Sequence, residues 1–64
     1  MKKVKMTKLT AMRKSRKMSQ RELGEKVGMT SDTISYYERG VRNPSITTLI
    51  ELAKALDCDV RDLV

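Results

Sequence analysis

The segment spanning residues 19–40 constrains the fold of this chain more than any other. It contains two short amphipathic stretches, residues 20–27 and 31–38, joined by a turn of only three residues. Leu23 and Val27 lie four positions apart in the first stretch, which is the spacing of one face of an α-helix. A similar apolar pair occurs in the second stretch. The segment therefore predicts two short helices that meet at a steep angle and share one core.

Two glycines support this interpretation. Gly28 follows the first helix, and glycine readily adopts the left-handed backbone conformation that ends a helix. Gly24 lies inside that helix, where a glycine costs roughly 1 kcal/mol relative to alanine. A small residue at this position leaves room for a second helix that crosses closely. The pattern indicates a helix-turn-helix motif, in which the second helix enters the major groove of DNA.

Capping residues place the helix starts. Ser19 and Glu22 form a capping box, and Thr30 is expected to cap the helix over residues 31–38. Further caps are expected at Thr7, Ser45 and Asp59. The sequence thus predicts a compact all-α bundle of five helices over residues 7–64, preceded by a basic, flexible arm at residues 1–6. Ile34 and Tyr37 are expected to face inward, and Gly40 to end the second helix of the motif.

The pattern resembles the phage-repressor-like helix-turn-helix family, the Cro and lambda-repressor type, also called the XRE family. The resemblance spans nearly the whole chain and is carried by Leu9, Met12, Arg13, Ser19, Gln20, Leu23, Gly24, Val27, Gly28, Ile34, Ser35, Glu38, Gly40, Asn43, Pro44, Ser45, Leu49, Leu52, Ala53, Ala55, Leu56, Val60 and Leu63. Gly24 stands where the family usually has alanine, and Asp57 where it often has glycine. The resemblance implies a lambda-repressor-like domain that binds pseudo-palindromic operator DNA as a homodimer.

The resemblance also implies which side chains touch the bases. Once Ile34 and Tyr37 point inward, the outward positions of their helix are Ser31, Asp32, Ser35 and Tyr36. A serine hydroxyl can donate or accept a hydrogen bond, an aspartate can accept from cytosine N4, and an aromatic ring can pack on a thymine methyl. The alternative is a solvated helix face, on which Asp32 merely complements the helix dipole.

A second set of residues is implied to contact the DNA backbone. This set consists of Gln20, Thr30, Arg39, Arg42 and Asn43, with further contacts from the arm at Lys2, Lys3 and Lys5. Solvated surface charges are the alternative, and for the three lysines the two interpretations weigh about equally. Arg13 and Glu38 match a family pair that joins the first helix to the end of the third, so a structural salt bridge is expected there.

Charge and composition agree with a DNA-binding protein. The formal net charge is +6, and residues 1–17 hold eight basic and no acidic residues. Such a basic pole suits a polyanion. The absence of histidine argues against a zinc site and against an enzyme, and the single cysteine excludes an intramolecular disulfide. No apolar run approaches the roughly 20 residues of a membrane span. We therefore expect a cytoplasmic protein without metal, cofactor or membrane contact, and the family resemblance implies a bacterial or phage origin.

The predicted function is sequence-specific binding of double-stranded DNA by a small transcriptional regulator that acts by occupancy. The bound protein would block or recruit polymerase, and a repressor is the favoured form. Two other classes remain open: a protein-interaction module, such as an antitoxin-type regulator, and a membrane-surface peptide. The repeated caps and glycine stops disfavour the second of these. The acidic C-terminal end, with Val60, Leu63 and Val64, could supply a dimer surface, and these residues could equally belong to the core.

Overall fold

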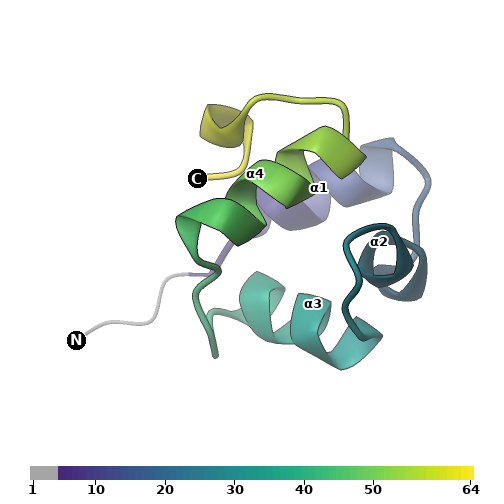
Figure 1. Cartoon of the computed structure of the whole chain (residues 1–64), viewed down its shortest axis with the longest axis vertical. Coiled ribbons are helices and arrows are strands. Elements are labelled where there is room, and N and C mark those ends of the chain that lie inside the picture. Colours follow the sequence, from purple (N-terminus) through teal and green to yellow (C-terminus); the bar gives the residue numbers. More distant parts are fainter. Residues whose placement is uncertain (1–4) are drawn as a thin grey trace.

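The computed structural model describes residues 5–64 and shows four α-helices followed by a single 3₁₀ turn (Figure 1). The elements are α1 (Thr7–Ser15), α2 (Gln20–Lys26), α3 (Ser31–Arg39), α4 (Ile46–Ala55) and the 3₁₀ turn η1 (Val60–Asp62). In Figure 1, α4 and α1 form one side of the molecule and α3 the other, with α2 closing one end. This arrangement leaves the outer face of α3 uncovered by the other helices.

The expected fifth helix is the one element that the structure corrects. Val60–Asp62 forms a 3₁₀ turn, held by hydrogen bonds from the Asp62 amide to the Asp59 carbonyl (2.9 Å) and from the Leu63 amide to the Val60 carbonyl (2.9 Å). The sequence signal was two apolar residues three positions apart, a spacing that a 3₁₀ turn of three residues satisfies as well as an α-helix. The turn is enough to bring Leu63 into the core.

A small aliphatic core joins all the helices. Ile34 and Tyr37 point inward from α3, as predicted, with exposed fractions of 0% and 8%. They pack in one cluster with Leu9, Leu23, Leu52, Ala53, Leu56 and Leu63. Met6, which the sequence assigned to the arm, also packs against this cluster. The inner face of α3 is thus fixed by burial, and its opposite face is left for other contacts.

Gly24 allows the close crossing of α2 and α3. A Cβ atom at this position would lie 2.6 Å from the Met29 carbonyl oxygen and 3.1 Å from backbone atoms of Thr30. The Gly24 carbonyl in turn accepts a hydrogen bond of 2.7 Å from the Met29 amide. The turn between α2 and α3 therefore lies directly on the glycine, which confirms that a small residue is needed there.

All four α-helices end in the same way. A residue one or two positions after each helix adopts a left-handed conformation, and the next amide donates back to a carbonyl in the last turn, as the Met18 amide does to the Arg13 carbonyl (3.1 Å). The left-handed residues are Lys17 (φ 57°), Gly28 (φ 72°), Gly40 (φ 77°) and Asp57 (φ 53°). Two of these four turns thus use a residue with a side chain, although glycine is the residue best suited to them.

We expect Lys17→Gly to stabilise the domain by about 0.5–1 kcal/mol, because left-handed strain of roughly 1–2 kcal/mol outweighs the entropy that glycine adds to the unfolded chain. Asp57→Gly should increase the stability of the domain by a smaller amount, since aspartate tolerates the left-handed conformation better than lysine. Urea denaturation followed by circular dichroism measures both effects. Lys17→Ala is the control, because it removes the same charge and keeps the strain. Equal stability of Lys17→Gly and Lys17→Ala would contradict the account.

The predicted caps are mostly confirmed. Ser19 Oγ accepts from the Glu22 amide (3.0 Å), and a Glu22 carboxylate oxygen accepts from the Ser19 amide (2.9 Å), completing the capping box. Ser45 Oγ caps α4 through the Thr48 amide (3.2 Å). Thr7 does not cap α1, because the helix already begins at Thr7 and the preceding residue makes no side-chain cap bond.

An arginine that the sequence analysis did not single out joins the two ends of the fold. The Arg16 side chain, just after α1, donates to the carbonyl oxygens of Leu56 (2.8 Å) and Asp57 (3.2 Å) at the end of α4. These carbonyls lack partners within their own helix, so the guanidinium satisfies them.

No helix among residues 5–64 is both long and apolar enough to cross a membrane.

Candidate nucleic-acid interface

The first turn of α3 projects two polar side chains into solvent. Thr30 caps the helix by accepting from the Thr33 amide (3.2 Å), and its hydroxyl also lies 3.1 Å from that of Thr33. Ser31 and Asp32 follow directly, and both are exposed. The cap fixes the direction in which α3 begins, and with it the direction of these two side chains.

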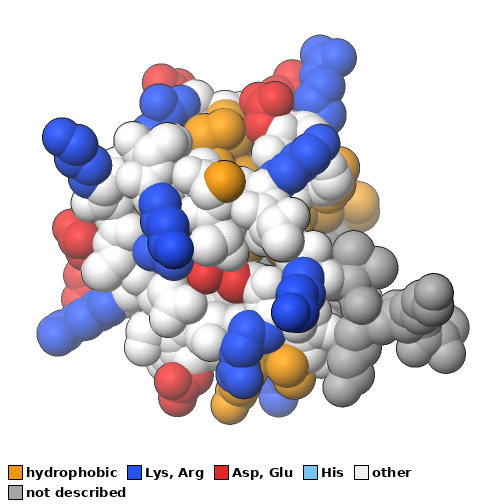
Figure 2. All heavy atoms as spheres, turned by 180° about the vertical axis from the view of Figure 1, so that it is seen from behind, with side chains coloured by type: hydrophobic (Ala, Val, Ile, Leu, Met, Phe, Trp, Pro, Cys, Tyr) orange, Lys and Arg blue, Asp and Glu red, His pale blue; other side chains and the backbone are white. Residues whose placement is uncertain are grey.

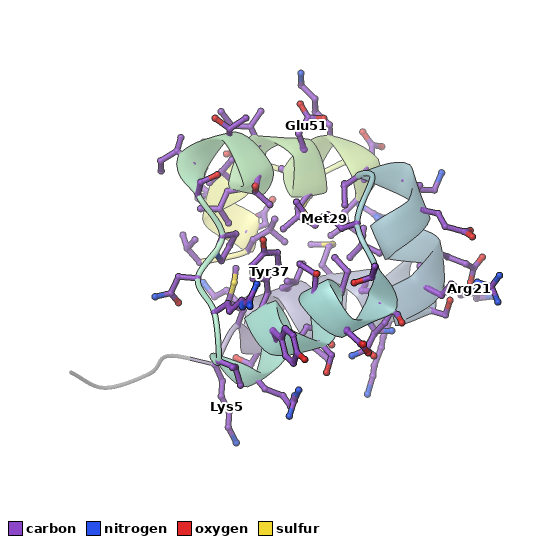
Figure 3. All side chains as sticks on the ribbon, turned by 60° about the horizontal axis from the view of Figure 1, so that its bottom comes forward. Lys5, Arg21, Met29, Tyr37 and Glu51 are labelled. Carbon is purple, nitrogen blue, oxygen red and sulfur yellow. The ribbon has the colours of Figure 1, made fainter. Side chains whose placement is uncertain are left out.

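The structure brings the four expected base-reading residues together on one face. Ser35 and Tyr36 are half-buried and lie one helical turn beyond Ser31 and Asp32, so the four form two adjacent rows along α3. In Figure 3, Tyr37 points from α3 into the interior, between the helices. The outer face of α3 therefore presents two hydroxyls, a carboxylate and an aromatic ring.

The end of α3 carries an arrangement that the sequence analysis missed. The guanidinium carbons of Arg39 and Arg42 lie 5.4 Å and 5.5 Å from the centre of the Tyr36 ring. Arg39 Nε also donates to Ser35 Oγ (3.1 Å). The three-residue spacing of Tyr36 and Arg39 could have suggested the first contact. The second depends on the turn at Gly40 and has no signal in the sequence.

Gln20 is held by an acidic side chain. Its side-chain amide nitrogen donates a hydrogen bond to Glu38 Oε1 (3.1 Å). The Glu38 carboxylate also accepts two hydrogen bonds from Arg13, from Nε to Oε2 (2.6 Å) and from Nη2 to Oε1 (3.2 Å). Arg13 Nη1 donates to the Met18 carbonyl (2.8 Å). The salt bridge predicted between Arg13 and Glu38 thus has the expected partners. The bond between Gln20 and Glu38 is an additional contact, and within residues 5–64 it uses one of the two amide hydrogens of Gln20.

The Glu38 carboxylate stays ionised although it is largely buried. Burial alone would raise the pKa of Glu38, but hydrogen bonds from Arg13 and Gln20, together with the Arg13 charge, lower the pKa below its ordinary value of 4.5. Only 6% of the Glu38 side chain and 10% of the Arg13 side chain remain exposed. The pair therefore joins α1 to α3 as a charged, bidentate contact inside the protein.

Lys5 and Asn43 lie beside the end of α3. Both line an open hollow of about 330 Å³, whose other walls come from Met6, Thr7, Lys8, Pro44, Leu49, Leu63 and Val64. In Figure 3, Lys5 projects away from the body of the molecule on the side where α3 lies. Lys5 is thus the arm residue that the structure places near the loop after α3. Lys2 and Lys3 lie outside the described residues.

The basic charge of the first 17 residues is partly used within the fold. Arg13 is buried against Glu38, so its guanidinium is not an open surface charge, whereas Arg16 donates to the end of α4 and remains exposed. Figure 2 shows the face opposite to that of Figure 1, where further Lys and Arg side chains project from most parts of the surface. The charge that can meet a polyanion is therefore carried by exposed side chains, Lys5, Arg39 and Arg42 among them.

Cys58 has no feature of a reactive site. Its side chain packs against the core cluster, and the residue is half-buried. Burial and the neighbouring Asp62 carboxylate raise the pKa of the Cys58 thiol above its ordinary value, although Arg16 acts in the opposite direction. The thiol is therefore the dominant form at neutral pH, as expected for a cysteine that fills space in a core.

Comparison with known proteins identifies the family. A helix-turn-helix family model matches residues 9–63. An uncharacterized HTH-type transcriptional regulator of Sinorhizobium fredii is 44% identical over 81% of this chain, and the chain spans only 26% of that protein. Another such regulator, from Archaeoglobus fulgidus, is 33% identical over 89% of this chain and 81% of its own length.

Two solved structures share the fold. The P22 c2 repressor, crystallised in complex with a synthetic operator, superposes with a TM-score of 0.86 at 35% identity, covering 95% of this chain and 94% of the crystallised repressor chain. The restriction-modification controller protein C.AhdI from Aeromonas hydrophila gives a TM-score of 0.86 at 33% identity, covering 91% of this chain and 84% of that protein. The chain belongs to the XRE-type, lambda-repressor-like family of DNA-binding helix-turn-helix transcriptional regulators.

Proposed function

We propose that this chain binds double-stranded DNA sequence-specifically, with α3 in the major groove, and represses transcription by occupying an operator. The observation that carries the proposal is the outer face of α3. It projects Ser31, Asp32, Ser35 and Tyr36 from a helix whose other face is locked into the core. Hydroxyl, carboxylate and aromatic groups at these positions suit base edges, which the major groove displays in a distinct pattern for each base pair.

The phosphate contacts would fix the register of α3 in the groove. Arg39 and Arg42 lie at the end of α3 with Asn43 beside them, and all three are exposed. At the other end, Thr30 is exposed at the start of α3, and the bond from Gln20 to Glu38 uses one of the two amide hydrogens of Gln20. Contacts at both ends of a recognition helix set its position and orientation, and the base contacts between them then select the sequence.

The protein is proposed to act as a homodimer. Ile46 and Ile50 lie one turn apart on α4 with exposed fractions of 71% and 41%, and Val64 is 64% exposed. Of the residues considered either for a dimer surface or for the core, Leu63 is fully buried and Val60 half-buried, so these two belong with the core and only Val64 is exposed. Figure 1 shows the start of α4 and the chain end side by side at one end of the molecule.

In-vitro selection from random duplexes tests this function directly. The purified protein should enrich an inverted repeat whose half-sites are centred about one helical turn, or about 34 Å, apart. Enrichment of single half-sites would support sequence-specific binding but would contradict the proposed homodimer. A pool that stays random after several rounds, while the protein remains folded, would overturn the proposed function.

A further inference from the structure

We propose that Arg39 and Arg42 act as a clamp that fixes the orientation of the Tyr36 ring for base readout. This inference rests on the proposed function and adds a role that neither arginine would have as a simple phosphate contact. The two guanidiniums would be positioning residues for sequence selection. Tyr36 would be the side chain that touches the base.

The clamp has two parts of different origin. Arg39 lies three residues after Tyr36 on the same helix, and its guanidinium carbon is 5.4 Å from the ring centre. Arg42 comes from the loop beyond the helix and lies 5.5 Å from the same ring centre. A guanidinium within about 6 Å of a ring centroid is attracted to the face of the ring. Tyr36 is thus held by two separate cations.

The backbone turn at Gly40 brings Arg42 back to the ring. Gly40 adopts φ 77°, and the Val41 and Arg42 amides then donate to the Tyr36 carbonyl at 2.9 Å and 3.3 Å. The residue that carries the ring and the residue that carries the second guanidinium are therefore hydrogen-bonded through their backbones. These hydrogen bonds hold the Arg42 backbone close to Tyr36, so the Arg42 side chain can reach the face of the Tyr36 ring.

Arg39 links the ring to a second candidate base contact. Its Nε donates to Ser35 Oγ at 3.1 Å while its guanidinium lies over Tyr36. One arginine thus orients two neighbouring side chains of the readout face. Because a stacked guanidinium keeps its N–H edge free, Arg39 and Arg42 can still donate to phosphates from the clamped position. Phosphate binding and ring orientation would then occur together.

The double variant Arg39→Lys/Arg42→Lys separates the two roles. Lysine keeps both positive charges but lacks the planar group that stacks on a ring. If the clamp exists, this variant should keep its salt dependence and its affinity for unrelated duplexes. It should also lose discrimination at the base pair read by Tyr36, as Tyr36→Ala does. A good base contact corresponds to a discrimination of about 5-fold or more, so the loss is measurable.

The measurement is a base-by-base binding matrix for the wild type, Tyr36→Ala and the double lysine variant, using duplexes from the selection. Arg21→Lys is the matched control, because Arg21 lies on α2, is exposed and, among residues 5–64, forms a salt bridge with Glu25 alone. Its matrix should equal that of the wild type. A double lysine variant with an unchanged matrix would overturn the clamp.

A second readout separates failure of the clamp from failure of the proposed function. The χ1 rotamer of Tyr36, measured by NMR couplings in the free protein, should be single in the wild type and averaged in the double lysine variant. If the wild type selects no DNA sequence, the proposed function fails and this rotamer measurement alone decides the clamp. An equally averaged Tyr36 rotamer in both proteins would overturn it.

Discussion

Glu38→Ala should destabilise the domain by about 3–5 kcal/mol, because it leaves the Arg13 guanidinium buried without its carboxylate. Counted over backbone and side chain together, Arg13 and Glu38 are each only 8% exposed, and Gln20 would lose its hydrogen bond to Glu38 as well. A chain of this size is expected to have a total stability of only about 3–10 kcal/mol. Urea denaturation should therefore show a domain that is marginally folded or already unfolded at 25 °C.

A double-mutant cycle with Arg13→Ala tests the cause of this loss. The double variant should be less destabilised than the sum of the two single variants, since removing both charges leaves no unpaired ion. Glu25→Ala is the matched control. It breaks the exposed pair with Arg21, whose atoms are 3.6 Å apart, and should cost only about 0–1 kcal/mol. Strict additivity in the cycle would show that Arg13 and Glu38 do not interact in solution.

The same carboxylate determines how this pair responds to acid. Because the pKa of Glu38 is lower in the folded protein than its ordinary value of 4.5, its contribution to stability is fully present above that value. The contribution is lost as the pH falls from 4.5 through the folded-state pKa. Glu38→Gln should therefore weaken the fall in stability below pH 4.5. A fall as steep as that of the wild type would contradict this assignment.

DNA affinity should fall about 1,000-fold between 50 mM and 200 mM salt if each copy of a dimer places three cations on phosphates, since binding then releases the counterions of about six phosphates. The candidate cations are Lys5, Arg39 and Arg42, which are all exposed. Fluorescence anisotropy with a labelled operator duplex measures the dissociation constant across this salt range.

Single lysine variants identify which charges take part. Lys5→Ala should reduce the salt slope by about one unit per copy, because one phosphate contact is lost. Lys54→Ala removes the same charge from an exposed position on α4 and should leave the slope unchanged. A dissociation constant that stays flat from 50 mM to 200 mM would show that Lys and Arg contacts do not hold the DNA.

The sequence predicted those parts of the fold that depend on neighbouring residues. Ser19, Thr30 and Ser45 cap helices because a cap involves only the next few residues. The role of Gly24 could be predicted because a glycine inside a helix is unfavourable unless space is short. The turn between α2 and α3 does limit the space, since a Cβ atom at Gly24 would lie 2.6 Å from the Met29 carbonyl oxygen. The Arg13–Glu38 pair was accessible only through the family resemblance, since its partners are 25 residues apart.

The features that sequence reasoning missed depend on tertiary geometry. Arg16 reaches a carbonyl 40 residues away, which no local pattern encodes. Ile46 has the helical spacing of a core residue, yet it is 71% exposed because α4 is covered on one side only. The contact between Arg42 and Tyr36 requires the left-handed turn at Gly40 to reverse the chain. In each case the residue type was informative, but its partner was decided by the packing of the helices.

If α3 selects the DNA sequence, a binding matrix for Asp32→Ala should differ from that of the wild type. Asp32 is exposed in the first turn of α3, where phosphates would repel it unless a base donor meets its carboxylate. Cytosine N4 is the donor that suits it, and the contact should be worth about 1–3 kcal/mol of discrimination. Glu51→Ala is the control, because it removes the same charge from α4, where Figure 3 shows Glu51 pointing away from α3.

The two variants should differ in one column of the matrix. Asp32→Ala should relax the preference at a single base pair of each half-site and bind unrelated duplexes more tightly, since a negative charge near the phosphates is gone. Glu51→Ala should leave every column as in the wild type. If Asp32→Ala leaves every column unchanged as well, Asp32 only complements the helix dipole, and base selection by the first turn of α3 is contradicted.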